Sequence, residues 1–114
     1  FDKMVQAHMA WKSKIRAYVD GMDIGVTYDT ATDPTACVLG QWYYGEGQKY
    51  AHYQTMQQLG EAHAQMHAAI KQVMDAKEID DADLVDQGLA QVDRQSDEVV
   101  ALLYQMMDEV EPSA

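Results

Sequence analysis

The chain has 114 residues, of which 47% are hydrophobic, so its length and composition suit one domain with a modest core. It carries 8 basic and 19 acidic residues, and this net charge of −11 disfavours nucleic acid and an anionic membrane surface as partners. A single cysteine excludes an internal disulfide and suits a reducing cytosol, and the sequence shows no signal peptide or membrane span.

The first predicted element is a helix over residues 2–22. Its apolar and aromatic side chains recur every three or four residues, with a histidine in the same row: Met4, His8, Trp11, Ile15, Tyr18 and Met22. Gly21 stands where such a helix is expected to end. Residues 23–33 are predicted as a loop, and their carboxylates do not have the spacing of a calcium-binding EF-hand.

Short helices are predicted in the middle of the chain. Asp33 followed by Pro34 is a typical helix start, which predicts a short helix over residues 34–44 that carries Cys37. Two glycines shortly after residue 44 end it. A further short helix is expected over residues 48–56.

Long helices are predicted for the rest of the chain. A helix over residues 57–78 places apolar side chains and two histidines on one face. The final helix starts after a cap at Asp80 or Asp81 and stops at Pro112. Its apolar row is regular: Val85, Leu89, Val92, Ser96, Val99, Leu103, Met106 and Val110. These patterns predict an all-α fold, an antiparallel four-helix bundle with an additional short helix carrying the cysteine.

Four side chains on this scaffold form a candidate metal site. His63 and His67 are four residues apart, so they lie one turn apart on one face of a helix. His8 lies in the apolar row of the first helix, and Cys37 supplies the thiol. Three imidazoles and a thiolate fill a tetrahedral zinc shell, which leaves no open position for a catalytic water. The sequence therefore predicts a zinc site without enzymatic activity. The alternative is three core histidines that each bind a backbone or hydroxyl partner.

The remaining histidine, a nearby glutamate and the methionines have no pattern typical of a reactive site. His52 has no second ligand at helical spacing, so we expect a surface or packing role. Glu61 precedes His63 by two residues and should face away from it. Several of the eight methionines lie on apolar rows, which favours packing over a copper site. A di-iron bundle would need Glu-x-x-His pairs, and the chain has none.

Four ordered motifs resemble one known family, the chemoreceptor zinc-binding (CZB) domain, over about residues 4–107. The motifs are His8-Met9-Ala10-Trp11-Lys12 followed by Gly21, Cys37-Val38-Leu39-Gly40-Gln41-Trp42, Leu59 with His63 and His67, and Gln95-Ser96-Asp97-Glu98-Val99-Val100. The resemblance implies zinc held by His8, Cys37, His63 and His67. Tyr43 stands where leucine is commoner, and we expect it to alter packing but not ligation.

The same resemblance implies a regulatory module of a bacterial chemoreceptor or diguanylate cyclase, usually cytoplasmic. Such domains are implicated in sensing zinc or oxidants such as hypochlorous acid through the cysteine. A purely structural zinc site in a dimerisation module is the alternative. The long apolar row of the final helix leads us to expect a homodimer. Because the chain begins with Phe1, we expect residues 1–114 to be one domain of a longer signalling protein, linked to a further signalling domain.

Overall fold

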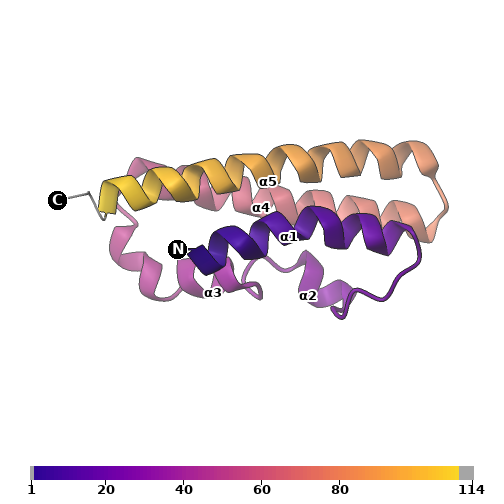
Figure 1. Ribbon diagram of the computed structural model, residues 1–114, viewed down its shortest axis with the longest axis horizontal. Helices are drawn as coiled ribbons and strands as arrows, with labels where there is room; N and C mark the ends of the chain where they lie inside the picture. The colour runs from indigo at the N-terminus through magenta and orange to yellow at the C-terminus, as the bar shows by residue number, and fades with distance from the viewer. Residues whose placement is uncertain (1, 111–114) are drawn as a thin grey trace.

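The computed structural model describes residues 2–110, which form an all-α fold without strands. Figure 1 shows α4 and α5 side by side as a long hairpin, with α1 lying along them and the short helices on one side. The described chain is elongated, with extents of 50 × 21 × 20 Å. Its elements are α1 (Asp2–Val19), α2 (Tyr28–Thr32), α3 (Val38–Tyr43), the 3-10 helix η1 (Glu46–Tyr50), α4 (Gln54–Glu78) and α5 (Ala82–Val110).

The expected four-helix bundle is not shown, because only α1, α4 and α5 are long. The segment between α1 and α4 is broken into short pieces. Gly21 and Gly25 have φ of +87° and +74°, which residues with a side chain rarely adopt. Pro34 lacks a backbone N–H and so prevents a helix from continuing through this position. The helix end at Gly21 is confirmed. Met22 is 62% exposed rather than part of the apolar row, because α1 has already ended.

The short elements differ from their predicted bounds. The helix predicted over residues 34–44 is shorter than expected, because α3 begins at Val38 and Cys37 is its N-cap rather than a residue within it. The helix expected over residues 48–56 is instead η1 followed by the first turn of α4. At the α4–α5 turn, the Asp81 carboxylate accepts from the Leu84 N–H at 3.1 Å, which confirms the second of the two predicted caps. Pro112 lies outside the described residues.

The core consists of two apolar clusters along the bundle axis. One gathers side chains around Leu39, Leu59 and Leu103, and the other gathers side chains around Trp11 and Ile70. The predicted row of α5 is confirmed, since its central members are buried against α1 and α4: Val85, Val92, Ser96, Val99, Leu103 and Met106. Because the two clusters meet near His8 on α1 and His63 on α4, a polar layer divides the core.

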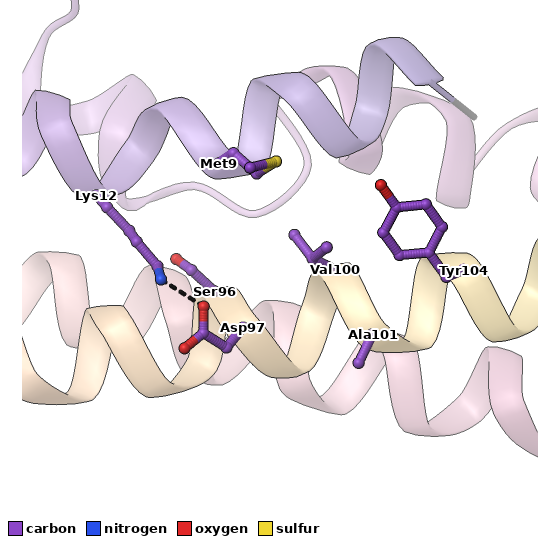
Figure 2. Close-up of a pocket in the computed structure, with 7 residues that line it drawn as sticks. All are labelled: Met9, Lys12, Ser96, Asp97, Val100, Ala101 and Tyr104. Atoms are coloured by element: carbon purple, nitrogen blue, oxygen red, sulfur yellow. Dashed lines mark hydrogen bonds and ion pairs between the residues drawn. The ribbon is translucent and has the colours of Figure 1, made fainter.

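Ion pairs join α1 to α5 along their outer edge. Arg16 binds Asp93 at 2.5 Å, and Lys12 reaches across to Asp97, as Figure 2 shows. Both pairs are solvent-exposed, so each is expected to contribute at most about 1 kcal/mol. No helix in the described part of the chain is both long enough and apolar enough to cross a membrane.

Candidate metal centre

The polar layer of the core consists of His8, Cys37, His63 and His67. The potential ligand atoms of these four side chains all lie within 4.8 Å of one another. The histidines are at most 1% exposed and come from the two long helices α1 and α4. Cys37 is partly buried at the N-terminus of α3. All four predicted residues are therefore brought together from three separate elements.

The distances within the cluster suit a tetrahedral ion. His63 Nε2 lies 3.1 Å from Cys37 Sγ and 3.1 Å from His67 Nε2, and Cys37 Sγ lies 3.9 Å from His8 Nε2. Ligand atoms of a tetrahedral zinc site are separated by about 3.3–3.6 Å, given Zn–N near 2.0–2.1 Å and Zn–S near 2.3 Å. The donor set and its spacing fit zinc.

Backbone carbonyls orient two of the imidazoles. His8 Nδ1 donates to the Met4 carbonyl at 3.2 Å, and His67 Nδ1 donates to the Ala31 carbonyl at 2.8 Å. With the proton on Nδ1, the Nε2 lone pair is free to bind a metal. The alternative of independent core histidines explains these Nδ1 partners. It does not explain why the Nε2 atoms and a thiol converge on one point.

Burial keeps the imidazoles neutral. It lowers the pKa of His8 to about 4 and that of His63 to about 3, and it also lowers the pKa of His67. Neutral imidazole is the form that ligates a metal. Burial raises the pKa of the Cys37 thiol, and the Gly40 N–H, which donates to Sγ at 3.3 Å, opposes that rise. A bound cation would favour the thiolate much more strongly.

Comparison with known protein families agrees with this geometry. Residues 8–74 match the family described as the chemoreceptor zinc-binding domain, CZB. The chain belongs to the CZB family. No curated protein and no solved structure matches the chain. CZB domains form a sensory and regulatory family rather than a catalytic one, and zinc is the cofactor that the family and the donor set both specify.

Side chains that we expected to lie outside the CZB site do so. His52 is exposed, and the centroid of its ring lies 4.6 Å from that of the Tyr53 ring. Glu61 is exposed on α4. Tyr43 donates to the Met56 carbonyl at 3.2 Å and lies over Gly60, where an added Cβ would meet its hydroxyl at 2.2 Å. Tyr43 therefore packs directly against α4 and lies outside the group of potential metal ligands.

Two backbone carbonyls that support the site, those of Met4 and Ala31, were not predicted from the sequence. The spacing of the first helix could have indicated Met4, because it lies four residues before His8 in the same helix. Ala31 lies in a segment that we predicted as loop, and the group involved is backbone. No side-chain pattern could have indicated it.

Proposed function

We propose that this CZB domain is a zinc-dependent sensor within a bacterial chemoreceptor or diguanylate cyclase. His8, Cys37, His63 and His67 would together hold a single zinc ion, and this Lewis acid would favour the thiolate form of Cys37. Zinc itself, or an oxidant such as hypochlorous acid, is the proposed signal. The observation that carries this proposal is the unequal support of the four ligands.

The three histidines are anchored much more firmly than the cysteine. They are fully buried on helices of 18 and 25 residues. Cys37 caps a helix of only six residues and is partly exposed. A helix this short has little stability of its own and depends on tertiary contacts. Cys37 can therefore leave the cluster without the unfolding of α1, α4 or α5.

Cysteine is also the ligand that an oxidant attacks. The Cys37 thiolate would react with hypochlorous acid to give a sulfenic acid and chloride, a two-electron oxidation of sulfur. A sulfenic acid is a poorer ligand than a thiolate, so zinc would be left with three imidazoles. The released α3 segment would then alter a neighbouring output domain.

The proposal is tested with the zinc-loaded protein and sub-stoichiometric hypochlorous acid. Elemental analysis should first give one zinc per chain. Oxidant should then release zinc to a fluorescent dye and accelerate hydrogen exchange in residues 34–44 before the long helices respond. Cys37→Ser should remain folded but lose the oxidant response. Retention of zinc with Cys37 unmodified would refute redox sensing and favour direct zinc sensing or a structural zinc site.

A structural zinc site in a dimerisation module is the second candidate, and retention of zinc under oxidant is the observation that would favour it. The di-iron alternative finds no support in the CZB site, since none of its four members is a carboxylate. We further propose that residues 1–114 are one cytoplasmic domain linked to a signalling domain, without direct contact with nucleic acid or membrane. The full-length reading frame would test this arrangement.

We also propose that the domain forms a homodimer, although the apolar row of α5 is covered by its own chain. Apolar surface remains at Met9 on α1 and Tyr104 on α5, which are 57% and 52% exposed and line a groove of about 350 Å³ together with Val100 (Figure 2). Sedimentation at tens of micromolar, on the order of weak dimer affinities, should show a dimer that Tyr104→Glu weakens. A wild-type protein that sediments only as a monomer would contradict the proposal.

A further inference from the structure

The two oriented histidines of the CZB site obtain their carbonyl partners in different ways. His8 uses Met4 of its own helix, so α1 supplies both the ligand and its support. His67 uses Ala31, which is 36 positions away in the five-residue helix α2. The orientation of His67 therefore depends on where α2 lies, whereas the orientation of His8 does not.

Helix α2 is too short to hold its position by itself. A five-residue helix is far below the length at which isolated helices become stable. Its N-cap is local, since Thr27 Oγ1 accepts from the Thr30 N–H at 3.2 Å. The loop before it contains Gly21 and Gly25, both with positive φ. Contacts with the long helices must therefore fix α2.

Two such contacts lie on either side of the Ala31 carbonyl. The Ala31 side chain is fully buried in the cluster that contains Trp11 and Ile70. On the exposed side, Tyr28 Oη donates to Asp75 Oδ1 at 2.8 Å, which ties the first residue of α2 to α4. Burial of a methyl group is non-directional, whereas a hydrogen bond restricts both distance and angle. The Tyr28–Asp75 bond therefore restricts how α2 can be aligned along α4.

Asp75 is itself held in place. Lys71 Nζ donates to Asp75 Oδ2 at 2.9 Å, so each carboxylate oxygen accepts a different donor. Lys71 and Tyr28 together lower the pKa of Asp75, which remains an ionised acceptor at neutral pH. Asp75 also lies eight residues, about two turns, beyond His67 on the same helix. One rigid helix therefore carries both the ligand and the anchor of its support.

We infer that Tyr28 and Asp75 are positioning residues for His67: their hydrogen bond holds α2 where the Ala31 carbonyl accepts the His67 Nδ1–H. This inference rests on the proposed role of His67 as a zinc ligand. The Trp11 ring also packs edge-on against His67 at 5.6 Å. That contact restrains the ring plane, but only the carbonyl selects the nitrogen that carries the proton.

Tyr28→Phe tests the inference, because it removes the hydroxyl and keeps the ring. Loss of a group that hydrogen-bonds a metal ligand commonly costs ten- to a hundredfold in affinity. Tyr28 does not bind His67 directly but acts through the position of the Ala31 carbonyl, so we expect a smaller effect. We expect the zinc dissociation constant, measured by competition with a chelator, to rise about three- to tenfold. The Nδ1–H tautomer signal of His67 in nitrogen-15 NMR spectra should weaken, while that of His8 stays unchanged.

Matched variants separate positioning from general loosening. Tyr53→Phe makes the same chemical change at the N-cap of α4, where the side chain makes no capping hydrogen bond, and should bind zinc like the wild type. Asp75→Ala should reproduce the Tyr28→Phe effect, and the double variant should lose no more than either single one, because both remove the same bond. Asp75→Asn retains an acceptor oxygen and should recover part of the affinity.

Three results would overturn the inference. Tyr28→Phe could bind zinc with wild-type affinity, it could disturb His8 and His67 equally, or its effect could add fully to that of Asp75→Ala. A wild-type protein that binds no zinc would instead refute the proposed function. The two failures are therefore distinguishable within one set of titrations.

Discussion

Gly40→Ala should separate Cys37 from the zinc site while leaving the long helices intact. Gly40 is buried in α3 and lies directly against the turn that precedes it. A Cβ added at Gly40 would lie 1.9 Å from the Pro34 carbonyl oxygen and 2.9 Å from Thr35 Cα. These are backbone atoms, so no side-chain rotation can relieve the clash. The Cys37 turn must therefore change shape.

The size of the effect follows from the required movement. Ordinary contact begins near 3.4 Å, so atoms must separate by about 3.4 − 1.9 = 1.5 Å. Metal–ligand distances tolerate only about 0.2 Å, which this displacement greatly exceeds. Apparent zinc binding of about 10–16 kcal/mol shared by four ligands gives roughly 3 kcal/mol for each. Loss of the Cys37 bond alone should therefore weaken zinc binding about 100-fold.

Competition titration with a chelator measures the affinity, and circular dichroism checks the helix content. Cys37→Ala provides the control background, because Gly40→Ala should have no further effect on zinc affinity once the thiolate is gone. If Gly40→Ala binds zinc as tightly as the wild type, either the turn is not rigid or Cys37 is not a ligand. A large additional loss in the Cys37→Ala background would show that the turn supports the histidines instead.

His63→Ala should reduce the zinc content, measured by elemental analysis, to well below one per chain. His63 Nε2 lies 3.1 Å from both Cys37 Sγ and His67 Nε2, so the variant removes the central ligand of the site. Gly88→Ala should lower the free energy of unfolding by about 1–3 kcal/mol, since its Cβ would lie 2.5 Å from Val73 Cγ2 at the α4–α5 contact. Zinc stoichiometry should not change, and adding Val73→Ala should recover part of the lost stability in thermal denaturation.

The long helices and the three histidines of the site were predictable because both depend on regular spacing. A row of apolar side chains every three or four residues indicates α1, α4 and α5, and the i, i+4 pair His63 and His67 must lie on one face. His8 falls in such a row, and Cys37 is the only thiol in the chain. None of these inferences requires knowledge of how the helices pack.

The segment between α1 and α4 was less predictable because tertiary contacts decide it. Asp33 was predicted to cap a helix, but its carboxylate accepts from the Thr35 N–H at 2.9 Å in a turn, and Cys37 caps α3 instead. Helix α2 forms in a predicted loop because Ala31 is buried and Tyr28 binds α4. Such contacts join residues tens of positions apart, which local sequence patterns do not encode.

The hydrogen-bond partner of Ser96 was also not predictable from local sequence patterns, although its helix was predicted correctly. A serine in an apolar row of a helix can return its hydroxyl to a backbone carbonyl of the same helix. It donates instead to the Met66 thioether at 3.3 Å, from α5 across to α4. The burial of Ser96 was predictable from the row, but its partner depends on the register between two helices.

Helices α1 and α5, which the Lys12–Asp97 and Arg16–Asp93 pairs join, have opposite net charges, so the attachment of α1 to α5 should depend on ionic strength. Helix α1 carries four basic and one acidic residue, 4 − 1 = +3, whereas α5 carries one basic and seven acidic residues, 1 − 7 = −6. The screening length falls from about 30 Å at 0.01 M salt to about 3 Å at 1 M. Concentrated salt should therefore weaken the attachment of α1 to α5. Since α1 brings His8 to the cluster, zinc affinity at neutral pH should fall as salt rises.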